Sequence, residues 1–265
     1  MKDIALQITR ESKGEKLHML REYVQNYILF LMQKLGMSSS LYFVGGTALR
    51  FLYRIRRYSE DLDFSAAEDW SASDLSIFMK KIVNQLEKSG YSCTINIKER
   101  HGVQKAVIGF IDLLYEAGLT HRKEQKLNIH LEIDLNPPKG WIGTKTIVDL
   151  HLPVVLQHYD LASLFAGKCH AVLMRAYTKG RDVYDLFWYR TKQKDLSPNF
   201  ELLNNALQQT REGYVKVTRD NWLEILGQRI RSFKWETLEN DVLPFLEFQD
   251  ELLSFTRENL LMLLS

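Results

Sequence analysis

The chain has 265 residues, of which 45% are hydrophobic and 26% are charged. This composition supports one large or two modest globular domains and excludes a disordered or fibrous chain. Because 35 Lys and Arg residues nearly balance 33 Asp and Glu residues, the net charge of +2 gives no general attraction to nucleic acid, and any contact with a polyanion must be local.

The chain shows no signal for a membrane segment or a disulfide scaffold. Its two cysteines, Cys93 and Cys169, lie far apart and neither belongs to a C-x-x-C motif, which indicates a reducing compartment. Residues Met1–Arg10 lack the long apolar core of a signal peptide. The apolar run Tyr27–Met32 is far shorter than the roughly 20 residues that a membrane-spanning helix needs. We therefore expect a cytoplasmic protein that does not contact a membrane.

The first elements in chain order are a helix, a strand and a second helix. Apolar residues recur at helical spacing over about Glu15–Leu35, and Gly36 suits the left-handed turn that ends a helix. Leu41–Val44 is a short β-prone run that ends in Gly45-Gly46. A helix is then expected over Thr47–Arg57, with Thr47 as the capping residue near its start.

Four strands and one helix follow, up to a pair of prolines. We expect strands over Asp61–Ser65, Cys93–Ile97, Ala106–Leu113 and Leu127–Leu135, and a helix over about Ser73–Lys88. The last strand is the clearest, because its apolar and polar residues alternate without interruption and so predict one core face and one polar face. Pro137-Pro138 ends it, since proline cannot donate a hydrogen bond to a neighbouring strand.

Helical patterns dominate from about Asp160 onward. They run to Arg175 and continue over Arg181–Tyr189, Leu202–Gln209 and Asp241–Leu264. The expected fold class is therefore α/β (α+β), with a mixed sheet flanked by helices followed by a helical lobe. We place the first lobe, including the N-terminal helix, at residues 1–155 and the helical C-terminal lobe at residues 156–265.

Paired carboxylates are the first candidate for chemistry. Asp61 and Asp63 are separated by one residue, so on a strand their side chains project to the same side. Such anions repel one another unless a cation lies between them, and Mg²⁺ suits them because it prefers oxygen ligands and retains waters and substrate phosphates. Asp134, on the polar face of the clearest strand, is the candidate for a third carboxylate of a two-metal site, and Glu132 on the same face is the alternative.

A glycine turn precedes these carboxylates. Gly45-Gly46-Thr47 offers backbone N–H groups at a helix N-terminus, where a phosphate is favoured. Taken alone, the turn is more simply interpreted as a plain tight turn, and D-x-D arises often by chance. The combination of the two features is what favours a nucleotide site.

Two stretches of the chain carry a resemblance to a known family. Gly45–Leu49 together with Arg57–Phe64, which contains the S-E-D-L-D run, closely resembles the signature of the AbiEii/AbiGii nucleotidyltransferase toxin family of the polymerase-beta-like nucleotidyltransferase superfamily. Lys168 and Arg181–Leu186 resemble a later lysine and the R/K-D-x-x-D-L element of the same family. The resemblance covers roughly residues 41–190.

The resemblance implies an enzyme with a polymerase-beta-like nucleotidyltransferase lobe that binds an NTP and Mg²⁺, with Mn²⁺ as the alternative ion. It implies transfer of an NMP to an acceptor hydroxyl of tRNA, another RNA or a protein. Members of the family often act as the toxin of a type IV toxin–antitoxin or phage-defence pair, so the resemblance also implies a cognate antitoxin. Some relatives modify tRNA ends.

The family's functional residues carry over to matching positions of this chain. The resemblance implies metal binding by Asp61 and Asp63, with Asp134 matching a looser feature of the family. It implies a phosphate ligand in Lys168, and Asp182 or Asp185 as support for the site. The residues implied in NTP binding are Gly45, Gly46, Thr47, Arg57, Ser59 and Lys168.

Three arginines form a second candidate feature. Arg50, Arg54 and Arg57 fall at helical spacing on the helix expected after the glycine turn, and such a stripe of like charges predicts a partner. That partner is either the phosphates of an NTP or RNA, or acidic neighbours on a solvated face.

Two other functions fit part of the pattern. A two-metal nuclease also uses three acidic residues, and would cleave nucleic acid without an added NTP. A non-catalytic nucleotide-binding protein of the same fold would bind an NTP and form no product. The Gly45-Gly46-Thr47 turn favours the transferase over the nuclease.

Overall fold

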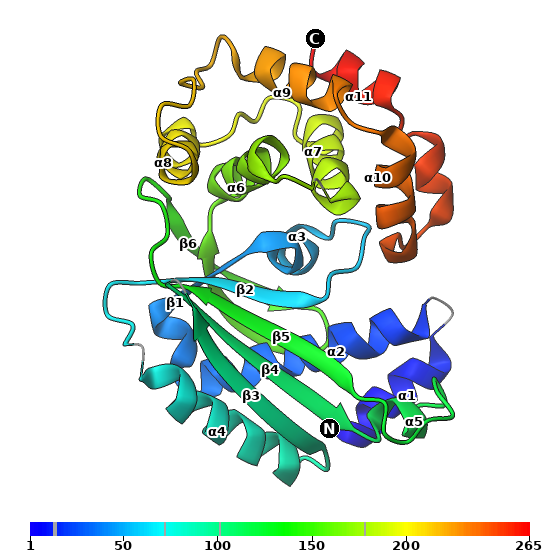
Figure 1. Cartoon of the computed structure of the whole chain (residues 1–265). Coiled ribbons are helices and arrows are strands. Elements are labelled where there is room, and N and C mark those ends of the chain that lie inside the picture. The colour runs from blue at the N-terminus through cyan, green and yellow to red at the C-terminus, as the bar shows by residue number, and fades with distance from the viewer. Residues whose placement is uncertain (13–14, 72, 101, 178) are drawn as a thin grey trace. The chain divides into compact units, whose positions relative to one another are not determined.

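A computed structural model gives the fold of the chain and describes residues 1–12, 15–71, 73–100, 102–177 and 179–265. The chain forms two compact units (Figure 1). The first unit comprises residues 1–53, 58–137 and 145–158, and the second comprises residues 54–57, 138–144 and 159–265. The short segment 54–57 therefore belongs to the second unit, although the residues on both sides of it belong to the first.

The first unit is built on a mixed sheet with the strand order β3-β4-β5-β2-β1-β7-β6. The strands are β1 (Leu41–Val44), β2 (Asp61–Ala66), β3 (Ser92–Arg100), β4 (Val103–Ile111), β5 (Leu127–Asp134), β6 (Gly143–Asp149) and β7 (Pro153–Tyr159). Strand β2 pairs antiparallel with β1 on one side and parallel with β5 on the other. The α/β class with a mixed sheet, expected from the sequence, is confirmed.

The alternation of β5 shows why this sheet has one covered and one open face. Leu127, Ile129 and Leu131 are buried, whereas Asn128 and His130 between them are exposed. Helices α2 (Lys16–Lys34) and α4 (Asp74–Lys88) pack against the strands and cover one face of the sheet (Figure 1). The exposed residues of β5 therefore project from the other face.

The remaining helices of the first unit are short. They are α1 (Lys2–Glu11), α3 (Gly45–Tyr53) and α5 (Leu113–Glu116), with a 3₁₀ turn over Met37–Ser40. The helix expected over about Glu15–Leu35 is confirmed as α2, and Gly36 after it has a φ of 78°, as its role in ending the helix requires.

The helix after the glycine turn is shorter than expected. Helix α3 begins at Gly45 and ends at Tyr53, so the expected extension to Arg57 is wrong. Arg54 has a φ of 56°, in the left-handed region that an α-helix excludes. The predicted stripe of Arg50, Arg54 and Arg57 on one helix is wrong for the same reason, because only Arg50 lies in α3.

Two strands of the sheet were not expected from the sequence. In β6 five successive residues are exposed before Val148 is buried, so the strand carries no alternation of polar and apolar residues. In β7 buried and exposed positions alternate over most of the strand. The sequence does not show this two-residue alternation, because Val154, Val155 and Leu156 are all apolar.

The second unit is helical. Its helices are α6 (Leu161–Met174), α7 (Gly180–Lys192), α8 (Phe200–Thr210), α9 (Trp222–Arg231), α10 (Trp235–Val242) and α11 (Arg257–Leu263). Asp160 caps α6 by accepting a hydrogen bond from the Ser163 N–H at 2.8 Å, and Phe165 of that helix stacks on Tyr189 in the core. The continuous helix expected over Asp241–Leu264 is wrong, because two 3₁₀ turns separate α10 from α11.

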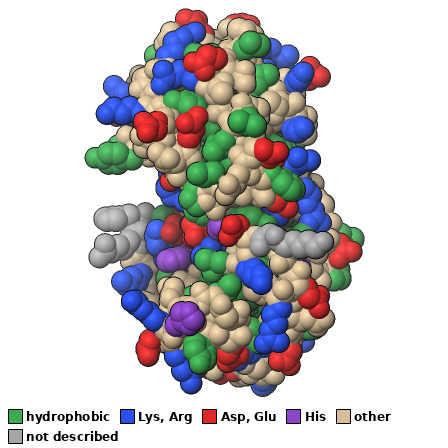
Figure 2. Space-filling view, turned by 90° about the vertical axis from the view of Figure 1, so that its right-hand side faces the viewer, with side chains coloured by type: hydrophobic (Ala, Val, Ile, Leu, Met, Phe, Trp, Pro, Cys, Tyr) green, Lys and Arg blue, Asp and Glu red, His purple; other side chains and the backbone are tan. Residues whose placement is uncertain are grey.

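The surface mixes charges of both signs. Figure 2 shows basic, acidic and histidine side chains interspersed with hydrophobic ones on one face, as a net charge of +2 leads one to expect. Within the described residues, no helix is both long and apolar enough to cross a membrane.

Candidate active site

The turn at Gly45 brings the backbone into contact with a candidate metal ligand. Gly45 has a φ of 81°, which glycine adopts without the steric cost of a side chain. The carboxylate of Asp63 lies against this backbone, and a Cβ on Gly45 would overlap with it. The turn therefore requires glycine for two reasons, the backbone angle and the close approach of Asp63.

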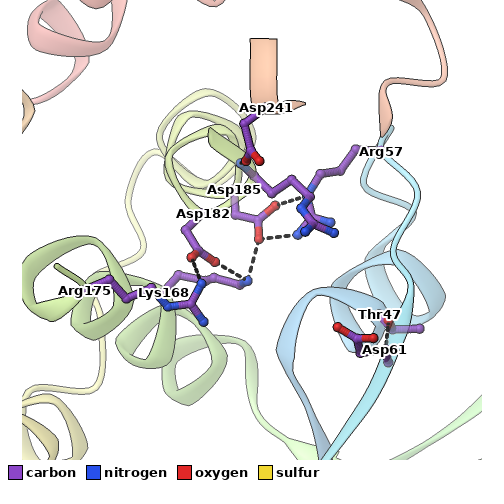
Figure 3. Close-up of polar contacts among 9 residues, drawn as sticks. Thr47, Arg57, Asp61, Lys168, Arg175, Asp182, Asp185 and Asp241 are labelled. Carbon is purple, nitrogen blue, oxygen red and sulfur yellow. Dashed lines mark hydrogen bonds and ion pairs between the residues drawn. The ribbon is translucent and has the colours of Figure 1, made fainter. Parts of the chain in front are cut away.

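Thr47 connects the first turn of α3 to the start of β2. Its side chain is fully buried, and its hydroxyl donates a hydrogen bond to the carbonyl oxygen of Asp61 (Figure 3). The hydroxyl therefore positions the β2 backbone at the first of the two aspartates. The expected contact of Thr47 with a triphosphate stays a prediction.

Asp61 and Asp63 occupy alternate positions of β2, as expected. Both are partly buried, whereas Leu62 and Phe64 are buried in the core. The two carboxylates thus project to the same side of the strand. Gln25 fixes the segment that precedes them, since its side-chain amide donates to the carbonyl oxygens of Ser59 and Glu60 at 3.2 and 2.8 Å.

Strand β5 supplies the two alternatives for a third carboxylate. In the parallel register, Glu132 lies opposite Asp63, and Asp134 lies opposite Ser65. Glu132 accepts a hydrogen bond from the Lys105 ammonium at 2.7 Å. Burial raises the pKa of Asp134, and the hydrogen bond that its carboxylate accepts from the Asn136 N–H only partly offsets this effect.

The carboxylates near the Gly45 turn suit a metal ion that takes few ligands from the protein and the rest from water and substrate. Among the described residues, no three or more His, Cys, Asp or Glu side chains form a group that could hold a metal ion by themselves. Asp61 and Asp63 alone form a two-carboxylate set beside the Gly45 turn. Mg²⁺ fits this arrangement, because it is commonly held by one or two carboxylates and completed by water and substrate phosphates.

The second unit contains a buried network of ion pairs that begins at Arg57. The guanidinium of Arg57 donates to both carboxylate oxygens of Asp185, at 2.6 and 2.5 Å (Figure 3). Both side chains are at most 2% exposed. This bidentate pair fixes the segment 54–57 to helix α7.

Lys168 of α6 extends the network. Its ammonium lies 2.7 Å from Asp185 and 3.0 Å from Asp182, and Asp182 also binds Arg175 at 2.5 Å (Figure 3). Burial alone would lower the pKa of Lys168, but the two carboxylates outweigh it and hold the pKa above its usual value. Burial alone would raise the pKa of Asp182, but Lys168 and Arg175 hold it below its usual value. Lys168 and Asp182 are therefore both charged at neutral pH.

The residues selected from the sequence fall into two groups. The first unit contains Gly45, Gly46, Thr47, Ser59, Asp61, Asp63 and Asp134, and the second contains Arg57, Lys168, Asp182 and Asp185. Direct contacts join the four residues of the second group, and in the first group they join Gly45 to Asp63 and Thr47 to Asp61, whereas the approach of Asp134 to the two β2 aspartates stays a prediction. Sequence reasoning missed Arg175 and Gln25, which hold Asp182 and the segment before β2. No motif marks either residue: Gln25 contacts a backbone segment that begins 34 positions later in the chain, and Arg175 lies at the end of α6, outside the R/K-D-x-x-D-L element.

Three solved structures are similar to this chain. JHP933 from Helicobacter pylori has a TM-score of 0.53 at 16% identity, over 95% of this chain and 90% of that one. A second H. pylori protein, described as a nucleotidyltransferase, has a TM-score of 0.52 at 16% identity, over 92% and 91% of the two chains. MenT4, a nucleotidyltransferase toxin from Mycobacterium tuberculosis, has a TM-score of 0.49 at 16% identity, over 100% and 99%. The first two show a shared fold.

Sequence comparison identifies the family. No curated protein matches the chain. The family described as nucleotidyl transferase AbiEii toxin, type IV TA system, matches residues 28–260 and thus most of the chain, including every site residue selected from the sequence. An antitoxin partner is implied by this family. The chain is therefore a nucleotidyltransferase that belongs to the AbiEii toxin family of type IV toxin–antitoxin systems.

Proposed function

We propose that the chain transfers an NMP from an NTP to an acceptor hydroxyl in a reaction that depends on Mg²⁺, with Mn²⁺ as a substitute. The observation that supports this proposal is the position of Asp63, which follows Asp61 on the same side of β2 and lies against the Gly45 turn. A metal held by the two carboxylates is thereby next to backbone N–H groups suited to a triphosphate.

Different residues of the first unit bind the triphosphate and the metal in this proposal. The N–H groups of Gly45, Gly46 and Thr47 lie at the start of α3, where the first N–H groups of a helix lack partners within the helix and favour phosphate. Asp61 and Asp63 hold the metal, and Thr47 keeps the Asp61 backbone in place. When bound, Mg²⁺ neutralises charge on the triphosphate and lowers the pKa of the acceptor hydroxyl.

The β5 carboxylates are the proposed acceptors of the hydroxyl proton. A carboxylate with a raised pKa is a better base near neutral pH, and burial gives Asp134 such a pKa. Glu132 lies closer in register to Asp63 and is the alternative. The role of Lys168 as a phosphate ligand stays a prediction, and Asp182 and Asp185 support it by keeping its ammonium charged.

The proposal also names the acceptor molecule and the biological role of the reaction. We take RNA, including tRNA, as the acceptor, with a protein hydroxyl as the alternative outcome. The family supports a toxin that a cognate antitoxin restrains. We further propose that this toxin acts in the cytoplasm and in defence against phage.

Label transfer from each of the four α-labelled NTPs to total cellular RNA or to protein tests the proposal. The wild type with Mg²⁺ should label an acceptor, and Asp63→Asn should abolish labelling while the unfolding midpoint stays close to that of the wild type. Asp69→Asn is the matched control, because Asp69 is an exposed aspartate that accepts a hydrogen bond from Ser40 at 2.8 Å.

Three results would contradict parts of the proposal. Labelling that persists in Asp63→Asn or in the presence of EDTA would show that the reaction does not use a metal held by Asp63. Cleavage of RNA without an NTP would indicate the nuclease. Tight NTP binding that yields no labelled product with RNA or protein would indicate a nucleotide-binding protein.

A further inference from the structure

Strand β6 forms one end of the sheet. Among the strands that the structure describes, β6 is the last in the order and lies next to β7. Every residue from Gly143 to Ile147 is exposed, and Ile147 is 71% exposed. An edge strand presents a row of backbone N–H and C=O groups with which a further strand can pair. An exposed isoleucine in such a strand makes β6 a candidate surface for association.

Alternation divides the side chains of β6 between two faces of the sheet. The Thr146 hydroxyl contacts a ring nitrogen of His158 in β7 at 2.9 Å, so Thr146 and His158 share one face. Lys145, Ile147 and Asp149 lie on the other face, and all three are exposed. Along that face the strand therefore carries a cation, an apolar group and an anion, with the two charges equally far from Ile147.

This order of side chains is complementary to itself when the strand is reversed. In an antiparallel pair of identical strands related by a two-fold axis, residues equally far from the axis on either side lie opposite one another. With the axis at Ile147, the Lys145 of each copy lies opposite the Asp149 of the other copy, and the two isoleucines face each other. We propose that two copies of this chain form a symmetric dimer by antiparallel pairing of β6 with β6 about Ile147.

The same charges select the register of the pair. An axis at Lys145 would place two lysines opposite each other, and an axis at Asp149 would place two aspartates opposite each other. An axis at Thr146 would place each Lys145 opposite an isoleucine. The axis at Ile147 is the one that sets both charges of each copy opposite a charge of the other sign, so it is favoured over its neighbours.

The described side chains of β3, at the opposite edge of the sheet, do not have this order. Its exposed charged residues Lys98 and Glu99 are adjacent, so they project to opposite faces. Residues that lie opposite each other in a two-fold antiparallel pair project to the same face, so Lys98 of one copy cannot lie opposite Glu99 of another. Charges on an edge strand then only oppose pairing. The β3 edge therefore serves as the internal control for the β6 edge.

The proposed contact has an apolar centre between charged residues, as protein interfaces commonly do. Val155 of β7 is 40% exposed and alternates with His158, so it lies on the face of Ile147 and adds to that centre. The net charge of +2 produces little general repulsion between two copies. The seven residues of β6 span only about 24 Å, so we expect a small interface and a Kd of about 10–100 µM.

Charge exchange tests the dimer in the full chain. Sedimentation velocity from about 1 to about 300 µM should show the wild type passing from monomer to dimer. Lys145→Asp and Asp149→Lys should each raise the Kd at least about tenfold, because like charges then lie opposite each other at two places. An equimolar mixture of the two variants should dimerise as the wild type does, since each acidic side chain of one variant lies opposite a lysine of the other.

Lys98→Asp is the matched control for these variants. It makes the same change of charge at an exposed position of the β3 edge and should leave the Kd of the dimer unchanged. A wild type that stays monomeric over the whole concentration range would overturn the inference. So would single β6 variants that dimerise as the wild type does, or a mixture that stays monomeric.

A cysteine at the axis tests the register. Opposite residues of an antiparallel pair have Cα atoms about 4.5–5.5 Å apart, within the range that a disulfide requires. Ile147→Cys should therefore form an intermolecular disulfide under mild oxidation, whereas Thr146→Cys should do so much less, because its two copies are diagonal neighbours about 7–8 Å apart. The wild type, with Cys93 and Cys169, gives the background.

Equal crosslinking of Ile147→Cys and Thr146→Cys, or faster crosslinking of Thr146→Cys, would overturn the axis at Ile147. The unfolding midpoint of each variant should match that of the wild type, because every substituted side chain is exposed. Since none of these measurements requires an NTP, the result is independent of the proposed function.

Discussion

The structure explains why the glycine turn of the sequence motif has glycine at position 45. Its left-handed backbone and its contact with Asp63 are two separate constraints, and either alone would favour glycine. Gly36 has nearly the same φ, 78° against 81°, but a Cβ there would meet nothing within 4 Å. Substituting alanine at Gly36 therefore introduces backbone strain alone, whereas substituting it at Gly45 introduces the same strain and also displaces the Asp63 carboxylate.

We predict that Gly45→Ala and Gly36→Ala each lower the free energy of unfolding by about 1–2 kcal/mol, because alanine is strained in the left-handed region. Only Gly45→Ala should also slow nucleotidyl transfer, by about a hundredfold, since its new methyl group moves the Asp63 carboxylate. Urea unfolding and label-transfer rates measure the two effects. Equal transfer rates in both variants would show that the position of Asp63 does not limit the reaction.

Some site residues follow from local pattern and others do not. The alternation of Asp61 and Asp63 with Leu62 and Phe64 is a property of two adjacent dipeptides, so the sequence could predict that the carboxylates share one face. The partner of Asp63 on β5 could not be predicted, because the register between β2 and β5 depends on pairing of segments that are distant in sequence. Glu132 and Asp134 alternate on the same strand, and only the register distinguishes them.

The end of α3 shows how a tertiary contact overrides local preference. Residues 54–57 continue the helical pattern of α3, so sequence alone extends the helix. In the fold, the chain leaves the helix at Arg54, and Arg57 binds Asp185, which lies 128 positions later in the chain. Strand β6 was missed for a different reason, since it is exposed at nearly every position and has no amphipathic pattern.

We predict that Arg57→Ala lowers the free energy of unfolding by about 3–5 kcal/mol, because it leaves the buried Asp185 carboxylate without its bidentate partner. Arg56→Ala is a matched control from the same segment. The Arg56 side chain is 63% exposed and lies 3.6 Å from Glu251, so its loss should cost less than about 1 kcal/mol.

Arg57→Lys makes the test specific for geometry. Lysine keeps the charge but lacks the planar fork that binds both oxygens of a carboxylate, so it should restore only part of the lost stability. Urea unfolding at neutral pH measures all three variants. Similar losses in Arg56→Ala and Arg57→Ala would show that the buried pair contributes no more than a surface pair.

Buried charges in both units make the stability of the chain depend on acid. In the first unit Glu22 is 4% exposed and its carboxylate lies 2.6 Å from Arg50, and in the second unit Asp182 is 4% exposed and binds Lys168 and Arg175. Burial alone would raise the pKa of Glu22, but His151 and Arg50 outweigh it, and the pKa of Asp182 is lowered in the same way by its two cations. Each unit thus holds a carboxylate that releases its proton more readily in the folded chain than in the unfolded one.

A carboxylate with a lowered folded pKa stabilises the fold fully above its unfolded pKa, about 4, and this contribution is lost as the pH falls through the folded pKa. We therefore predict that the urea midpoint of the wild type is nearly constant from pH 7 to pH 5 and falls steeply below pH 4. Glu22→Gln and Asp182→Asn should each be less stable than the wild type at pH 7, and their midpoints should fall less between pH 4 and pH 2, because the group that takes up the proton is gone. Since the two residues belong to different units and share no partner, the double variant should show the sum of the two changes in slope. An acid dependence in either single variant as steep as that of the wild type would mean that other carboxylates drive acid unfolding.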